Sequence, residues 1–220
     1  MAYGIRVRKR QGDKWKRART LKTPRGVWKT KKNAEFVLER LKKQGWRGHI
    51  FEIEDKFRIV SRKEWGAKPP KSSPVHDNWR DGVKQVVHHT ADHGPANSSK
   101  KAAYEHARSM QYFHQRVRGW NDIGYNYLVF PNGLVLEGRG FGVRGAGAAD
   151  SSGEWNTDYA HVSFVGTYTD KEPTKAAVDA YNKLRKHLKN AGAKTVARYG
   201  HGDLMPTSCP GDGVRRAVGL

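Results

Sequence analysis

Two adjacent histidines and a threonine end a short apolar segment in the middle of the chain, VVHHTA at 86–91. An apolar, β-branched run followed by polar residues is typical of a buried strand that carries functional groups at its end. Two further candidate ligands lie far away in sequence, His201 and Cys209, and Cys209 is the only cysteine. Imidazole nitrogens and one thiolate suit zinc, and three protein ligands leave the fourth tetrahedral position for water. These residue types therefore predict a hydrolytic zinc site.

The composition limits the possible partners. The chain has 220 residues, with 42 Lys and Arg against 21 Asp and Glu, so its formal net charge is +21. Such a charge favours polyanions, which include nucleic acid, teichoic acid and anionic membranes. A single cysteine excludes an intramolecular disulfide framework. The N-terminus lacks the apolar run of a signal peptide, and no apolar stretch is long enough to cross a bilayer, so we expect synthesis in a cytoplasm.

The basic charge is concentrated in the first quarter of the chain. Residues 1–57 contain 18 Lys and Arg against 6 Asp and Glu. Alternation around Ile5 predicts a half-buried strand, a helix follows between a Thr30 cap and Gly45, and residues 49–53 predict a closing strand. We therefore expect a small basic α+β domain at 1–57, which ends near residues 54–57.

Residues 58–220 predict a larger α/β domain in which strands alternate with helices. One helix is expected from Ser98 or Ser99 to a point before Gly119, and another from Thr174 to Gly192. The expected strands and hairpin are at 86–89, 127–136, 161–165 and 195–197. This alternation favours a central mixed β-sheet flanked by helices.

Several motifs of this second part occur in the order of a known family. They are HHTA at 88–91, MQYFH at 110–114, GWNDIGYNY at 119–127, EGRG at 137–140 and TSCPG at 207–211. Together they resemble the peptidoglycan-recognition and type-2 N-acetylmuramoyl-L-alanine amidase family. The resemblance implies a zinc-dependent domain that cleaves the amide between N-acetylmuramic acid and L-alanine. The added basic module makes the chain similar to a phage endolysin, a monomer made in the host cytoplasm that acts on bacterial peptidoglycan.

The resemblance also implies roles for individual residues. The family's first ligand precedes a threonine or serine-like residue, which gives His89, His201 and Cys209 as zinc ligands and leaves His88 as a strand residue. Tyr125 matches a tyrosine near the metal-bound water, where a hydroxyl can stabilise an oxyanion. Thr207 matches a position at which some phage amidases carry a catalytic lysine, so it is expected to assist.

Two glycines depart from the family pattern. Gly147 stands where members often have histidine, and Gly202 replaces a common arginine, so contacts with the stem peptide are expected to differ.

Three other interpretations remain open. A non-catalytic peptidoglycan receptor is one, although receptors of this family usually lack the cysteine ligand. A cysteine nucleophile with His201 as its base is another, but a metal also explains His89. We expect residues 1–57 to bind anionic wall polymers. The alternative is that they bind nucleic acid.

Overall fold

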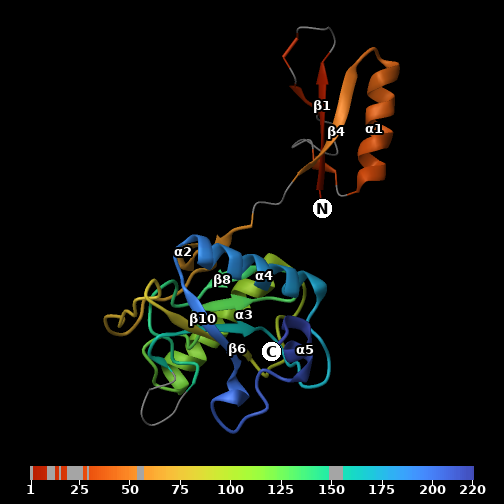
Figure 1. The fold of residues 1–220 in the computed structure, drawn as a ribbon. Coiled ribbons are helices and arrows are strands. Elements are labelled where there is room, and N and C mark those ends of the chain that lie inside the picture. The colour runs from red at the N-terminus through yellow and green to blue at the C-terminus, as the bar shows by residue number, and fades with distance from the viewer. Residues whose placement is uncertain are drawn as a thin grey trace. The chain divides into compact units, whose positions relative to one another are not determined.

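The structure, a computed structural model, describes residues 2–8, 13–14, 16–18, 27–28, 30–53, 57–148 and 156–220. The chain divides into two compact units, Met1–Lys56 and Phe57–Leu220 (Figure 1). The sequence placed the boundary after residue 57, and residues 54–56 lie outside the described part.

The first unit is a small antiparallel sheet with one helix. Its elements are β1 (Ala2–Arg8), β2 (Lys16–Arg17), β3 (Val27–Trp28), α1 (Lys31–Lys43) and β4 (Arg47–Ile53). Strand β1 pairs along its whole length with β4, and the two short strands β2 and β3 pair with different parts of its other edge. Ile5 of β1 packs against Ala34 and Leu38 of α1. The Thr30 hydroxyl accepts the Asn33 N–H at 3.2 Å, so the expected helix cap is present.

The second unit is built on a six-stranded sheet with the order β10-β6-β9-β7-β8-β5. The strands are β5 (Ile59–Val60), β6 (Val83–His89), β7 (Tyr127–Val129), β8 (Val135–Glu137), β9 (Tyr159–Phe164) and β10 (Thr195–Gly200). Only β7 and β8 pair antiparallel, as the expected hairpin, and the other neighbours are parallel. Parallel strands are joined by crossovers, which place helices over the faces of the sheet.

Helices cover both faces of this sheet. They are α2 (Arg62–Trp65), α3 (Lys100–Tyr112), which continues as the π-helical η1 (Phe113–Val117), α4 (Lys175–Asn190), η3 (His201–Asp203) and α5 (Asp212–Val218). Tyr181 and Leu184 of α4 pack with Val87 and other residues of one face, whereas Ala107 of α3 packs with Leu128 on the other. The predicted class, a central mixed sheet flanked by helices, is therefore confirmed.

Two predicted helix starts are confirmed by their caps. The Ser99 hydroxyl accepts the Ala102 N–H at 3.1 Å, and the Thr174 hydroxyl accepts the Ala177 N–H at 3.1 Å. Gly192 follows α4 with a φ of 101°, a left-handed conformation that costs glycine little. Among the described residues, no helix has the length and apolar character required to cross a bilayer.

Candidate metal centre

His88 and His89 lie on opposite faces of the central strand β6. Successive side chains of a strand alternate between the two faces of its sheet. Val87 packs with α4, and Gln85 accepts the hydroxyl of Tyr181 from α4 at 2.6 Å, so the odd-numbered residues face that helix. His88 therefore faces the α3 side, and it is 1% exposed.

The end of β10 and the loop after it bring two more donors to His88. Strand β10 runs parallel beside β6, with Gly200 in register with Val87, so His201 emerges next to the end of β6. The Gly202 N–H donates to the Cys209 carbonyl at 2.7 Å, which folds the loop back onto η3. Cys209 Sγ consequently lies 3.8 Å from His88 Nδ1.

His88, His201 and Cys209 form a cluster with the dimensions of a metal site. One ligand atom from each residue lies within 4.8 Å of the other two. Zinc bonds of about 2.0 Å to nitrogen and 2.3 Å to sulfur separate tetrahedral ligands by about 3.5 Å, so a small side-chain adjustment would suffice. Two nitrogens and one sulfur form a donor set that zinc accepts in tetrahedral sites. The residues present therefore fit the metal that the sequence predicts.

The cluster contains His88 in place of the predicted ligand His89. The His89 side chain points to the α4 side, where its Nδ1 accepts the backbone N–H of Tyr168 at 3.2 Å. His89 contacts the cluster through its backbone, since its N–H donates to Cys209 Sγ at 3.4 Å and its carbonyl accepts from Cys209 Sγ at 3.7 Å. The alternation of the strand causes this difference, because adjacent residues cannot both point to the same face.

Burial keeps the three donors neutral. It lowers the pKa of His88 well below the usual range, and the nearby His161 and His201 lower it further. Burial also lowers the pKa of His201, and it raises the pKa of the Cys209 thiol to about 11. Neutral imidazoles have a lone pair ready for a metal, whereas the thiol must lose its proton when it binds one.

Tyr125 lies beside the cluster. Its ring centroid is 5.2 Å from that of His88 and 5.8 Å from that of His114. Burial raises the pKa of Tyr125 above its ordinary value, and the neighbouring Cys209 adds to this shift, so the phenol keeps its proton and remains a hydrogen-bond donor. The position suits the predicted role near the reacting carbonyl.

Thr207 is exposed and supports the loop that carries Cys209. Its Oγ1 accepts the backbone N–H of Cys209 at 3.2 Å, a local bond typical of threonine in tight turns. The structure thus gives Thr207 a structural role, and its assistance in catalysis stays a prediction.

Gly202 is required by this same loop. A Cβ atom at that position would lie 2.5 Å from the carbonyl oxygen of Thr207 and 3.1 Å from that of Cys209. The arginine that the family often carries there would not fit this loop.

Sequence reasoning missed His161, a buried histidine of β9. Its Nδ1 lies 2.9 Å from His88 Nε2. The only signal in the sequence was a histidine inside an otherwise apolar strand, and no local pattern indicated its neighbour.

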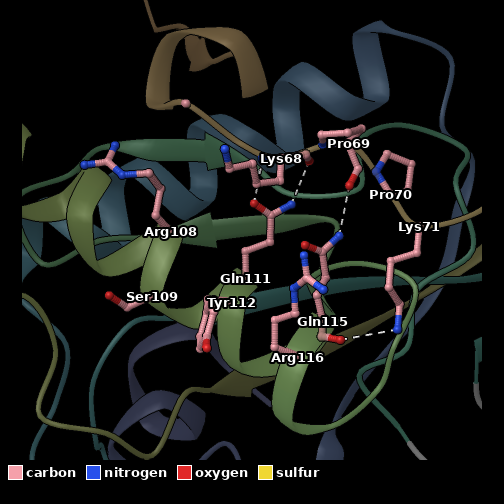
Figure 2. A pocket seen from close by; sticks show the side chains of 11 residues that line it. Lys68, Pro69, Pro70, Lys71, Arg108, Ser109, Gln111, Tyr112, Gln115 and Arg116 are labelled. Carbon is pink, nitrogen blue, oxygen red and sulfur yellow. Dashed lines mark hydrogen bonds between the residues drawn. The ribbon is translucent and has the colours of Figure 1, made fainter.

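A separate pocket of about 810 Å³ lies between the segment 66–71 and helices α3 and η1 (Figure 2). Lys71 Nζ donates to the Gln115 carbonyl at 3.2 Å, and Gln111 Nε2 donates to the Lys68 carbonyl at 2.9 Å, so side chains tie this segment to the helices. None of the three cluster residues lines the pocket.

The chain matches a family model described as N-acetylmuramoyl-L-alanine amidase over residues 80–212. It is 36% identical over 168 residues to peptidoglycan recognition protein 1 of Bos taurus, which covers 75% of this chain and 84% of the relative. Peptidoglycan-recognition protein SC2 of Drosophila melanogaster is 34% identical over 158 residues, which covers 71% of this chain and 82% of the relative.

Solved structures agree with these matches. Drosophila PGRP-LB aligns with a TM-score of 0.63 and 32% identity, over 71% of this chain and 88% of that protein. The ectodomain complex of peptidoglycan recognition proteins LCa and LCx, solved with bound tracheal cytotoxin, contains a chain that aligns with a TM-score of 0.67 and 30% identity, over 73% of this chain and 93% of that one. Sequence, fold and matched range agree, and the chain belongs to the peptidoglycan-recognition and N-acetylmuramoyl-L-alanine amidase family.

Proposed function

We propose that this chain is a zinc-dependent hydrolase that cleaves the amide between N-acetylmuramic acid and L-alanine in bacterial peptidoglycan. The observation that carries the proposal is the complete donor set of His88, His201 and Cys209. A non-catalytic receptor needs no such set, and the presence of the cysteine therefore favours the enzyme. A basic first unit in the same chain as an amidase-family unit supports the endolysin-like organisation expected from the sequence.

His88, His201 and Cys209 would hold the metal, and the protein would supply the remaining contacts. When bound, zinc supplies the Lewis acidity that lets water act as a nucleophile at neutral pH and that polarises an amide carbonyl. The Tyr125 phenol would donate a hydrogen bond to the carbonyl oxygen as negative charge develops on it. A donor that is fixed beforehand stabilises this charge without reorganisation.

The direct test is hydrolysis of purified cell walls with and without a chelator. The intact protein should clear the wall suspension, lose this activity after zinc removal, and regain it when zinc is added. Mass spectrometry should find stem peptides with a free L-alanine amino group. Fragments in which the lactyl amide is intact would exclude the proposed reaction.

Tyr125→Phe should lower turnover by roughly tenfold to a thousandfold, because it removes one donor to the developing oxyanion. Bound zinc and substrate affinity should change little, since the ring that packs beside His88 is retained. Steady-state kinetics on a soluble muropeptide, together with metal analysis, measure both effects. Unchanged turnover would leave Tyr125 with a packing role only.

We further infer that the first unit binds anionic wall polymers. Its helix α1 exposes Lys32, Arg40 and Lys43. A cation close to an anionic surface contributes up to about 1 kcal/mol, and this attraction weakens as salt shortens the screening length. Replacing all three by glutamine in the full chain should reduce pelleting with purified walls roughly tenfold at low salt.

A matched control removes three exposed cations from the second unit. Lys183, Lys186 and Lys189 lie on the exposed side of α4, and their replacement by glutamine causes the same loss of net charge. The control should pellet nearly as well as the natural chain, and both variants should cleave soluble muropeptides normally. Equal losses by the two triple variants would show that net charge alone, and not the first unit, drives wall binding.

A further inference from the structure

His161 is a fully buried histidine in direct contact with the metal-site residue His88. It is 0% exposed, and its Nδ1 lies 2.9 Å from His88 Nε2. In the sheet, His161 is in register with Val86, so its side chain emerges on the same face as His88. The two rings have centroids 5.2 Å apart and planes inclined by 30°. The partner of His88 Nε2, the ring nitrogen that points away from Cys209, is therefore an imidazole.

Two glycines make the space for this imidazole. A Cβ atom at Gly147 would lie 2.8 Å from His161 Nδ1 and 3.2 Å from His88 Nε2, and a Cβ atom at Gly145 would overlap the His161 ring. The segment between them is fixed, because the Ala146 N–H donates to the Gly124 carbonyl at 2.8 Å. Gly147, which departs from the family pattern, is thus necessary for the contact between His161 and His88.

Metal binding through His88 Nδ1 would determine which nitrogen carries each proton. His88 Nδ1 faces Cys209 Sγ at 3.8 Å, so this is the nitrogen available to a metal, and it must be unprotonated to bind one. A neutral imidazole then carries its proton on Nε2. In that tautomer the Nε2–H of His88 would donate to His161 Nδ1, which would accept as an unprotonated nitrogen.

We propose that His161 is a positioning residue, which holds His88 in the tautomer and orientation that bind the metal. This inference rests on the proposed zinc site. Metal-binding histidines usually donate their second N–H to a carboxylate, a carbonyl or water. An imidazole acceptor serves the same purpose, and it places no additional charge in the buried interior. Loss of such a partner typically lowers metal affinity or activity by roughly 10-fold to 100-fold.

The test compares two substitutions of His161 in the full-length protein. His161→Asn can place its amide oxygen near the position of Nδ1, so it keeps an acceptor, whereas His161→Leu is of similar size and has none. Zinc affinity is measured by competition with a chromophoric chelator, and site geometry by the visible absorption of the cobalt-substituted protein. The leucine variant should bind zinc roughly 10-fold to 100-fold more weakly with an altered cobalt spectrum, and the asparagine variant should regain most of the affinity.

Gly147→Ala provides a second route that leaves His161 in place. Its methyl group would push the imidazole away from His88 and should weaken zinc binding in the same direction. Gly82→Ala is the matched control, because a Cβ there would lie 3.7 Å from Val196 in ordinary contact. Natural zinc affinity and an unchanged cobalt spectrum in either His161→Leu or Gly147→Ala would overturn the proposal.

These measurements are independent of the proposed reaction. A protein that binds zinc but does not cleave peptidoglycan would contradict the proposed function, and the affinities of the His161 variants would still decide the positioning role. A natural chain that binds no zinc would contradict both.

Discussion

Alanine at position 88 should abolish zinc binding, whereas alanine at position 89 should leave the zinc in place. His88 provides one of the three donors that lie within 4.8 Å of each other. Without it only two protein ligands remain, fewer than the three of catalytic zinc sites. The bound zinc should therefore fall from about one per chain to nearly none in His88→Ala. Metal analysis after gel filtration gives the stoichiometry.

His89→Ala provides the matched comparison one residue away. It removes the side-chain acceptor of the Tyr168 N–H, so a buried donor is left without its partner. An unsatisfied buried group lowers the free energy of unfolding by about 1 to 3 kcal/mol. This variant should therefore unfold at a lower denaturant concentration while it keeps zinc and activity. The backbone N–H that donates to Cys209 is retained. Loss of zinc in His89→Ala with retention in His88→Ala would restore the sequence-based choice of ligand.

The adjacent histidines could not be separated by the hydropathy pattern of their strand. In a strand with one solvated face, alternation shows which residue points inward. Strand β6 lies between two parallel neighbours in a sheet that is covered on both faces. Every residue of β6 is buried except Lys84. Both His88 and His89 are thus surrounded by protein, and the hydropathy pattern does not indicate which of them points to which face of the sheet. Only the three-dimensional positions of the partners decide between them.

The helices were predictable because their signals are local. Thr30, Ser99 and Thr174 each cap a helix three residues before the N–H that they accept, and this spacing is visible in the sequence. The contact between His88 and His161 joins residues 73 positions apart. No local pattern specifies such a pair, since it depends on which strands become neighbours in the sheet.

The glycine departures have a steric explanation that the sequence alone did not provide. From the sequence, Gly147 and Gly202 predicted only that contacts with the stem peptide differ. In the structure, a neighbouring group occupies the space that a side chain at each glycine would need. This group is the ring of His161 at Gly147 and the carbonyl of Thr207 at Gly202. A side chain that is absent from a motif can therefore indicate that a neighbour occupies its space.

Cys209→Ser should eliminate wall hydrolysis while it preserves wall binding. The thiol is the only donor of the cluster that can become an anion, and a serine hydroxyl stays protonated, so the zinc affinity should collapse. Serine has nearly the same size, and the loop remains held by the Gly202 N–H and by Thr207 Oγ1. The fold should therefore survive. Turbidity of purified walls measures hydrolysis, and pelleting with the same walls measures binding.

Ser208→Ala is the control, because Ser208 is exposed and the bond from the Gly211 N–H to its carbonyl does not involve the side chain. It should bind zinc and lyse walls like the natural chain. Chelation of the natural protein distinguishes the metal from a cysteine nucleophile, since a thiolate that attacks the amide directly needs no zinc. If zinc is required, the chelated protein and Cys209→Ser should behave alike, binding walls without lysing them. Lysis that persists in the chelator but disappears in Cys209→Ser would instead establish nucleophilic cysteine chemistry.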